Sequence, residues 1–381
     1  MALNLESLRK TINETDKEMV ALFEKRMDAV AKIAEFKKQH NMKILDSGRE
    51  KEVITRAVSY LENQDLETSL RFFMEDLLTI SRQYQIARLG TEKTLHKEQT
   101  KIEIKPDSII GYYGSTGSYS EEAALEHFGD NISKKEYMTF DAVVTALLNQ
   151  EIDIGILPVE NSSTGIISTV MDLIRDNPVC IIGEHVKRIC HHLLVNPGTK
   201  LEDIEKVYSH QQGLEQSSEF LKQFSWEQIV YKSTAGSAEM VSKTRDKKKA
   251  AIASERCADI YGLEILIPNI HYNQDNYTRF IIIGREPVLN QHCNKISIVM
   301  GISHKPGALY GILRLFNERN LNLMKIESRP IIGKPWEYLF FFDFEGNLMD
   351  DRVKELLECL KDATHGFRVL GNYRAYEPGG C

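Results

Sequence analysis

The chain has 381 residues, of which 42% are hydrophobic and 27% charged, and its formal net charge is −7. This composition is typical of a globular protein with two or three domains. The acidic balance, without a basic block, argues against nucleic acid as a partner. No apolar run reaches the roughly 20 residues that span a bilayer, and no signal-peptide pattern opens the chain. Because the six cysteines form no CxxC pair, we expect a reducing, cytoplasmic location and no membrane association.

The first predicted element is a long helix over residues 5–37. No proline or glycine interrupts residues 2–38, and at ~1.5 Å per residue the helix would be about 50 Å long. Shorter helices are predicted from Asp46, as a cap, to about residue 62, and over residues 66–88. Because one protomer cannot cover the apolar seam of so long a helix, we expect an intertwined homodimer or a higher homo-oligomer. The seam consists of Leu5, Leu8, Ile12, Met19, Leu22, Val30 and Ile33.

Cations interrupt this seam. Arg26 occupies a position where the rhythm demands an apolar residue, and Lys37 follows Ile33 by four. A cation on a packing face costs several kcal/mol unless an anion meets it. The inward polar residues include no nucleophile–base pair and no metal-ligand set, so they predict a site that binds a dianion and stabilises developing charge. The alternative is a solvated coiled-coil face, which eight polar residues in this spacing argue against.

This pattern resembles the all-helical chorismate mutases over residues 5–88. The resemblance implies that three arginines bind the carboxylates of chorismate, that a lysine and a glutamine act at its ether oxygen, and that further polar residues surround the ring hydroxyl. The arginines are Arg9 from the partner protomer, Arg26 and Arg49. The lysine and glutamine are Lys37 and Gln85. The residues around the ring hydroxyl are Asp46, Glu50 and Ser81.

The sequence pattern changes twice after the helical region. Residues 93–107 are polar and read as a linker. From residue 108, apolar runs alternate with helical segments, which predicts an α/β region with two lobes and largely parallel strands. After a break near residues 286–294 the pattern β-α-β-β-α-β is ferredoxin-like. We therefore predict an all-α domain over 1–92, a two-lobed α/β domain over 108–286 and an α+β domain over 295–375.

Two cofactor patterns in the middle region fail on inspection. Gly111, Gly114 and Gly117 precede a helix, but the spacing is not G-x-G-x-x-G and no acidic residue follows at the required distance. His191 and His192 are adjacent on a predicted strand and point to opposite faces, which argues against a shared metal ion. No cofactor and no metal are therefore expected, and His210 is interpreted as an ordinary loop histidine.

Four loop segments of the middle region carry polar strings: Gly111–Ser120, Pro158–Gly165, Ser209–Gln212 with Gln216, and Asn276–Phe280. They resemble the prephenate dehydratase family over residues 109–285, although Ser115 and Gln211 stand where the family usually has proline. The resemblance implies two lobes that close on prephenate, with Thr278 as the catalytic hydroxyl. Arg279 is a candidate carboxylate anchor, or it faces away, since strand neighbours alternate. The other implied substrate contacts are Ser118, Asn161, Ser162, Thr164, Ser209 and Gln216.

Two strings in the last region resemble the ACT regulatory domain. One is Lys305-Pro-Gly307-Ala308-Leu309 and the other is Glu327-Ser328-Arg329-Pro330. The resemblance implies phenylalanine bound at a dimer interface, in contact with both strings. The plainer alternative is that Pro-Gly only turns a strand into a helix.

Together, the resemblances imply a bifunctional chorismate mutase–prephenate dehydratase with an ACT domain. It would convert chorismate to prephenate and then to phenylpyruvate, as one enzyme of phenylalanine biosynthesis that L-phenylalanine inhibits. One alternative is a two-lobed binding protein without chemistry, which the Thr278 and Asn161 strings argue against. Another is a mutase joined to a nicotinamide-dependent domain, which would need the dinucleotide fingerprint that the chain lacks.

Overall fold

The structure is a computed structural model that describes residues 4–40, 42, 47–89, 107–331 and 337–376. Asp46, nearly all of the predicted linker and residues 332–336 lie outside the described residues. The chain divides into two compact units. The first contains the three N-terminal helices and residues 309–321, and the second contains the α/β region and the remainder of the ferredoxin-like region.

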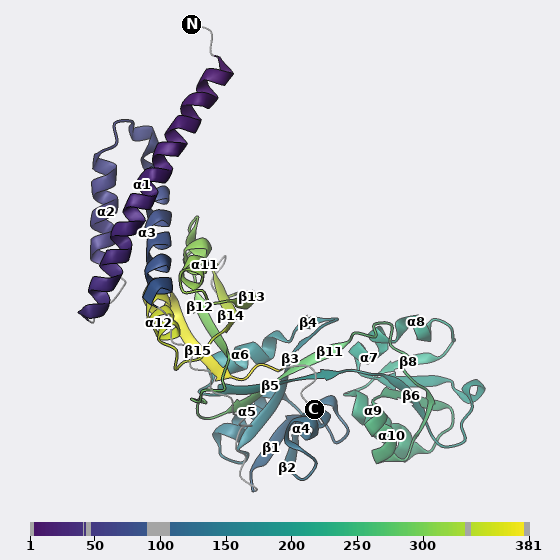
Figure 1. The fold of residues 1–381 in the computed structure, drawn as a ribbon. Coiled ribbons are helices and arrows are strands. Elements are labelled where there is room, and N and C mark those ends of the chain that lie inside the picture. The colour runs from purple at the N-terminus through teal and green to yellow at the C-terminus, as the bar shows by residue number, and fades with distance from the viewer. Residues whose placement is uncertain (1–3, 41, 43–46, 90–106, 332–336, 377–381) are drawn as a thin grey trace. The chain divides into compact units, whose positions relative to one another are not determined.

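The first unit confirms the three predicted helices (Figure 1). They are α1 (Leu5–Gln39), α2 (Ser47–Ser59) and α3 (Glu67–Leu89), with a short 3₁₀ turn η1 (Gln64–Leu66) before α3. Asn4 caps α1, because its side chain accepts a hydrogen bond from the N–H of Glu6. Helix α11 (Ala308–Glu318) supplies the rest of this unit.

Helix α1 is covered along only part of its length. Its buried residues are Met27, Val30, Ala31 and Ala34, all in the C-terminal half. Most of the predicted apolar seam is exposed in the described chain, including Leu5, Leu8, Ile12, Met19, Leu22 and Ile33. A stripe of large apolar side chains along one helix is typical of a surface that another helix covers.

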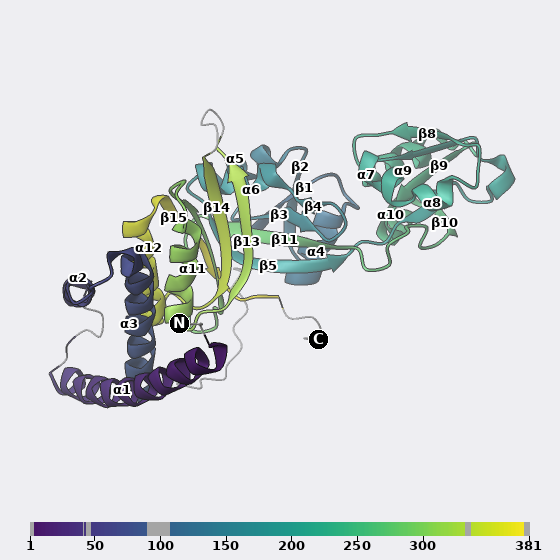
Figure 2. The same cartoon turned by 90° about the horizontal axis from the view of Figure 1, so that it is seen from above.

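The first lobe of the second unit is a mixed sheet in the order β5-β11-β3-β1-β2. Strands β1, β2 and β3 are parallel, whereas β11 is antiparallel to both β3 and β5. The expectation of largely parallel strands is therefore wrong for this half of the sheet. The reason is topological, because β5 carries the chain out to the second lobe and β11 brings it back (Figure 2). The elements are β1 (Ile109–Tyr113), α4 (Tyr119–Phe128), β2 (Ser133–Tyr137), α5 (Phe140–Leu148), β3 (Ile154–Asn161), β4 (Gly165–Ile166), α6 (Ser168–Asp176), β5 (Cys180–Arg188) and β11 (Tyr277–Gly284).

The second lobe is a smaller sheet in the order β10-β6-β9-β7-β8. Its central strands supply the core, and Leu193, Leu194 and Ile252 have 0% exposure. The elements are β6 (His192–Val195), η2 (Leu201–Asp203), β7 (Lys206–Ser209), α7 (Gln211–Gln216), α8 (Ser218–Leu221), β8 (Glu227–Val230), α9 (Thr234–Thr244), β9 (Lys249–Ala253), α10 (Glu255–Tyr261) and β10 (Glu264–Ile267).

The last region has the predicted ferredoxin-like strand order, β13-β14-β12-β15, and all these pairs are antiparallel. Strand β15 also pairs with β5, so this sheet continues into the first lobe. A Cβ at Gly371 would lie 2.4 Å from the carbonyl oxygen of Ile181, which explains why glycine stands at the junction. The elements are β12 (Lys295–Gly301), β13 (Leu323–Pro330), β14 (Tyr338–Glu345), α12 (Asp351–Ala363) and β15 (His365–Tyr373).

Candidate active sites

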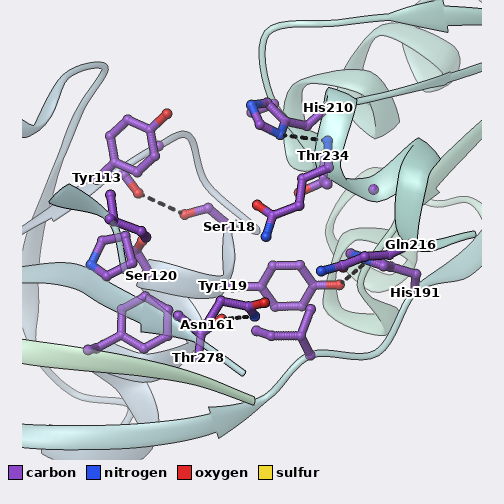
Figure 3. Close-up of a pocket in the computed structure, with 18 of the residues that line it drawn as sticks. Tyr113, Ser118, Tyr119, Ser120, Asn161, His191, His210, Gln216, Thr234 and Thr278 are labelled. Atoms are coloured by element: carbon purple, nitrogen blue, oxygen red, sulfur yellow. Dashed lines mark hydrogen bonds between the residues drawn. The ribbon is translucent and has the colours of Figure 1, made fainter. Parts of the chain in front are cut away.

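A cavity of about 370 Å³ lies within the second unit, lined by residues of both lobes (Figure 3). The first lobe contributes the loop after β1, the end of β3 and the start of β11. The second lobe contributes residues near α7 and the start of α9. Four of the predicted prephenate contacts line this cavity: Ser118, Asn161, Gln216 and Thr278.

Asn161 and Thr278 are register partners on the antiparallel strands β3 and β11. The Oδ1 atom of Asn161 accepts hydrogen bonds from the backbone N–H groups of Ser163 at 3.0 Å and Thr164 at 3.1 Å. The Nδ2 atom of Asn161 then donates to Thr278 Oγ1 at 2.9 Å. Because the Thr278 oxygen accepts this bond, its own hydrogen remains available to a ligand in the cavity.

Gln216 is the last residue of α7, and its side chain is buried beside the cavity. Its Oε1 atom lies 3.0 Å from Asn276 Nδ2 and 2.8 Å from His191 Nε2. The Nε2 atom of Gln216 is buried and has no hydrogen-bond partner among the described residues. Such an unsatisfied donor costs about 1–3 kcal/mol, and an acceptor on a ligand would relieve that cost.

Burial lowers the pKa of His191 to about 4, so its imidazole is neutral near pH 7. Burial raises the pKa of Tyr119 well above its usual value, so its hydroxyl stays protonated beside His191. Neither residue belongs to the predicted site, although both line the cavity. Thus the side chains of His191 and Tyr119 are both uncharged near pH 7.

The described residues that line the cavity include no lysine and no arginine. The N-termini of α4 and α9 lie at the cavity. Ser118 caps α4 and Ser233 caps α9, and both residues line the cavity. Helix N-termini stabilise anions through unpaired N–H groups and the helix dipole. The cavity can therefore receive carboxylates without a buried cation.

Three other predicted contacts lie just outside the cavity lining. Thr164 Oγ1 accepts a hydrogen bond from Gln212 Nε2 at 2.9 Å, and Gln212 does line the cavity. Ser162 Oγ donates to the carbonyl oxygen of Asp275 at 2.9 Å and supports the loop before Thr278. Ser209 is fully buried and donates to the carbonyl oxygen of Ile252 at 2.7 Å. Their contacts position the loops that carry the cavity residues.

Arg279 does not line the cavity, because alternate residues of β11 face opposite sides of the sheet. Of the two alternatives for Arg279, a carboxylate anchor in this cavity is wrong, and the structure has the residue facing away. Its guanidinium contacts Glu160 at 3.3 Å, Glu184 at 3.1 Å and Asp343 at 3.0 Å. Burial lowers the pKa of Arg279, but Asp343 and Glu184 raise it overall, so the group remains charged. Lys325 of β13 also contacts Glu160, at 2.7 Å. We call these five residues the Arg279 cluster.

In the first unit the structure brings together Arg26, Ser81 and Gln85. Arg26 of α1 donates a hydrogen bond to Ser81 of α3, and burial lowers the pKa of Arg26. Gln85 is buried one turn further along α3, and its Oε1 has no hydrogen-bond partner among the described residues. Ser81 and Gln85 share a helix face, as their spacing of four predicts.

The remaining predicted chorismate contacts are less enclosed within one chain. Arg49 is exposed and pairs with Glu52 at 2.9 Å, and Arg9 is exposed near the start of α1. Lys37 is half-buried near the end of α1, and Glu50 accepts a hydrogen bond from Arg82 of α3. Asp46 lies outside the described residues.

The predicted phenylalanine contacts lie on loop 305–307, at the start of α11 and on β13. Gly307 has a φ of +78°, a conformation that favours glycine. Along β13, Ser328 and Pro330 are exposed, whereas Glu327 and Arg329 are half-buried. Arg329 contacts Asp172 of α6 at 3.0 Å. Ala308 is half-buried and Leu309 is exposed.

Sequence reasoning missed Tyr119, His191 and Asn276. Asn276 belongs to the polar segment Asn276–Phe280 and stands two residues before Thr278. Its proximity to Thr278 could therefore have indicated that it belongs to the site. His191 was considered only as a metal ligand. Among the described residues, no group of three or more His, Cys, Asp or Glu could hold a metal ion, and no helix is both long and apolar enough to cross a bilayer.

Comparisons with known proteins agree with this division of the chain. Three family models match in order: chorismate mutase type II at residues 8–86, prephenate dehydratase at 110–288 and the ACT domain at 296–360. The chain is 34% identical over 371 residues to the bifunctional chorismate mutase/prephenate dehydratase of Aquifex aeolicus, and the match covers 97% of each.

Two solved structures resemble a large part of this chain. One is prephenate dehydratase from Arthrobacter aurescens in complex with L-Phe, at 28% identity and a TM-score of 0.64, covering 70% of this chain and 89% of that one. The other is GqqA, described as a novel type of quorum quenching acylase, with the same identity and TM-score, covering 70% of this chain and 98% of that one. With a relative 34% identical along nearly its whole length, the chain belongs to the bifunctional chorismate mutase/prephenate dehydratases and is an enzyme with both domains and an ACT domain.

Proposed function

We propose that the second unit converts prephenate to phenylpyruvate in the cavity of Figure 3, with Thr278 as the catalytic hydroxyl. The observation that carries this proposal is the hydrogen bond from Asn161 Nδ2 to Thr278 Oγ1, which leaves Thr278 as a donor. In the reaction the ring C–CO₂⁻ bond breaks and its electrons enter the ring. The C4 hydroxyl leaves and takes up one proton to become water. Thr278 would stabilise this oxygen as it departs.

The other cavity residues would hold the two carboxylates and the keto group of prephenate. Gln216 has an unsatisfied N–H donor, and Ser118 lies at the N-terminus of α4. Neutral donors suit this reaction, because a strong cation beside the ring carboxylate would oppose its loss as CO₂. Ser162, Thr164 and Ser209 would act by positioning loops, as their contacts with Asp275, Gln212 and Ile252 suggest.

We propose that the helical region rearranges chorismate to prephenate in a homodimer. Arg26 and Arg49 would bind the carboxylates with Arg9 from the partner protomer, and Lys37 and Gln85 would stabilise charge on the ether oxygen. Asp46, Glu50 and Ser81 would complete the surroundings. The exposed apolar seam of α1 supports this arrangement, since a partner would both cover the seam and bring an arginine.

The ACT region would bind L-phenylalanine and inhibit the enzyme. The solved prephenate dehydratase of A. aurescens that resembles this chain was crystallised with L-Phe. Residues 307–309 and 327–330 would form the site. The Arg279 cluster offers a physical connection, because Lys325 stands two residues before Glu327 and contacts Glu160, the neighbour of Asn161. Phenylalanine would inhibit only to the extent that it prefers a less active arrangement of these strands.

The domain boundaries that fit this proposal are 1–92, 108–286 and 295–375. The five described cysteines are free, as expected for a protein that works in the reducing cytoplasm.

The direct test is to incubate the protein with chorismate alone and follow the products. The proposal predicts transient prephenate and then phenylpyruvate, with no nucleotide added, and a slower second step when L-phenylalanine is present. Prephenate that accumulates until a nicotinamide nucleotide is supplied would contradict the dehydratase assignment.

A further inference from the structure

We propose that Asn276 and His191 are positioning residues of the dehydratase, which together fix the side-chain amide of Gln216 so that its NH₂ group is presented to the substrate. This inference rests on the proposed dehydratase function. It adds two residues to the site and assigns the proton of a buried histidine.

The orientation of the Asn161 side-chain amide fixes the donors and acceptors in the hydrogen bonds that link Asn161, Asn276, Gln216 and His191. Asn161 Oδ1 faces two backbone N–H groups, of Ser163 and Thr164, so Asn161 Nδ2 must point the other way. That Nδ2 lies 2.8 Å from Asn276 Oδ1. Reversing Asn161 would set its NH₂ against two N–H donors, which no hydrogen-bond arrangement permits.

The same reasoning passes from Asn276 to Gln216. Since Asn276 Oδ1 accepts from Asn161, the Nδ2 of Asn276 is the atom that faces Gln216, at 3.0 Å from Oε1. A reversed Gln216 would set donor against donor. The Gln216 oxygen is therefore held inward, and its Nε2 is the buried donor without a described partner beside the cavity.

His191 closes the group. Its Nε2 lies 2.8 Å from Gln216 Oε1, an atom that can only accept, so this nitrogen carries the proton of the neutral ring. The Nδ1 atom must then accept, and the single hydrogen of the Tyr119 hydroxyl lies between two acceptors, the carbonyl oxygen of Cys190 at 2.6 Å and His191 Nδ1 at 2.9 Å, and is shared between them. The competing arrangement, with Nδ1 protonated, would press a bare Nε2 against the Gln216 oxygen.

The consequence for the reaction is a division of labour. Thr278 is oriented by Asn161 alone and would act on the departing hydroxyl. Gln216 is oriented by Asn276 and His191 and would bind a carboxylate or carbonyl oxygen of prephenate in the ground state and the transition state alike. Loss of Asn276 should therefore raise KM for prephenate more than it lowers kcat.

Steady-state kinetics on the full-length Asn276→Asp variant test this division. A carboxylate at 276 still accepts from Asn161, but it cannot donate to Gln216 and it repels the Gln216 oxygen. Gln216 should therefore reverse, with the proton of His191 moving to Nδ1 so that Nε2 accepts, and it should present its oxygen to an anionic substrate. We expect KM for prephenate to rise by about tenfold or more and kcat/KM to fall by about the same factor, because kcat should change little, and we expect the mutase rate to be unchanged. Asn273→Asp is the matched control, since it adds the same charge in the same loop, outside the contacts of Gln216.

Equal effects of Asn276→Asp and Asn273→Asp, or a loss confined to kcat, would overturn the inference. A second measurement does not depend on the variant folding. The ¹⁵N spectrum of histidine-labelled wild-type protein should show His191 as the neutral Nε2–H tautomer from pH 8 to pH 5, and an Nδ1–H tautomer would overturn the inference by itself. Wild-type protein that never turns over prephenate would instead defeat the proposed function.

Discussion

The helical region and the two-lobed α/β region differ in how much of a site one chain can build. Around the α/β cavity, Asn161, Asn276, Gln216 and His191 are joined by hydrogen bonds within the same chain. In the helical region the N-terminal half of α1 has no buried residue, and Arg9 and Arg49 are exposed. We therefore propose that the dehydratase site is built within one protomer and that the mutase site is shared between two.

Geometry explains the difference. Two lobes joined by β5 and β11 can enclose a small molecule from both sides, as the cavity lining shows. A helix of 35 residues is longer than helices of 13 and 23 residues can cover, which leaves its apolar stripe exposed and supports the proposed homodimer.

The largest effect is expected from Thr278→Ala. Removing the hydroxyl takes away the donor to the departing oxygen, so dehydratase kcat should fall by about 100- to 1,000-fold. The mutase rate should stay within twofold, because the two sites share no residue. Separate assays with chorismate and with prephenate measure both.

Lys37→Ala is the reciprocal control for that experiment. It should remove the mutase step and leave the dehydratase intact. If either single substitution abolished both activities in a folded protein, the picture of two independent sites would be untenable.

The α/β region should also be the more sensitive to acid. Burial lowers the pKa of His191 from 6.5 to about 4. Between pH 6.5 and pH 4, His191 is therefore protonated in the unfolded chain and neutral in the folded chain. Stability from this group is full above pH 6.5 and falls by up to about 3 kcal/mol as the pH drops to 4. Chemical unfolding of wild type and His191→Gln over this range measures it, and identical pH dependence in both would refute the assignment.

Glutamate substitutions on the apolar seam of α1 should lower the mutase rate and leave the dehydratase rate unchanged. Ile12 and Leu22 are 59% and 64% exposed in the single chain, so Ile12→Glu with Leu22→Glu costs a lone protomer little. Because two unpaired carboxylates would be buried in the dimer interface, they should destabilise the dimer. The mutase rate should then fall about 100-fold, while the dehydratase rate should stay unchanged. Lys17→Glu, on the exposed surface of the same helix, is the control. An unaltered mutase rate in the double variant would exclude this seam as an interface.

The smallest effect is expected from Glu327→Ala on the regulatory side. The phenylalanine concentration for half-inhibition should rise about tenfold, or about 1.4 kcal/mol, while uninhibited activity is retained. Glu345→Ala, exposed at the end of β14, should not change it. An inhibition curve identical to wild type would count against residues 327–330 as the binding site.

Much of the fold could be predicted from the sequence because periodicity is strong where burial is strong. The helices at 5–39 and 67–89 and the strand Lys295–Gly301 follow their apolar patterns closely. Strands β2 and β8 cannot be predicted from apolar runs, because Ser133–Tyr137 and Glu227–Val230 are largely exposed and their polar residues give no alternation. The antiparallel pairing of β11 depends on the path between lobes, which no local pattern encodes.

The candidate site was predictable only in part for a similar reason. Thr278, Asn161 and Gln216 stand in recognisable strings. His191 and Tyr119 acquire their importance from contacts across 25 and 72 residues of sequence, which nothing local announces. Arg279 sits beside Thr278 in sequence, and strand alternation sends it to the opposite face, into the Arg279 cluster.

The most direct test of the contrast between one-chain and two-chain sites is complementation between variants. An Arg9→Ala protomer paired with a Lys37→Ala protomer would form one intact mutase site, so co-expression should restore activity to about a quarter of the sites. The matched pair Thr278→Ala and Asn161→Ala should restore no dehydratase activity. Mutase activity that stays at the level of the separate variants, or dehydratase activity that recovers, would contradict the account.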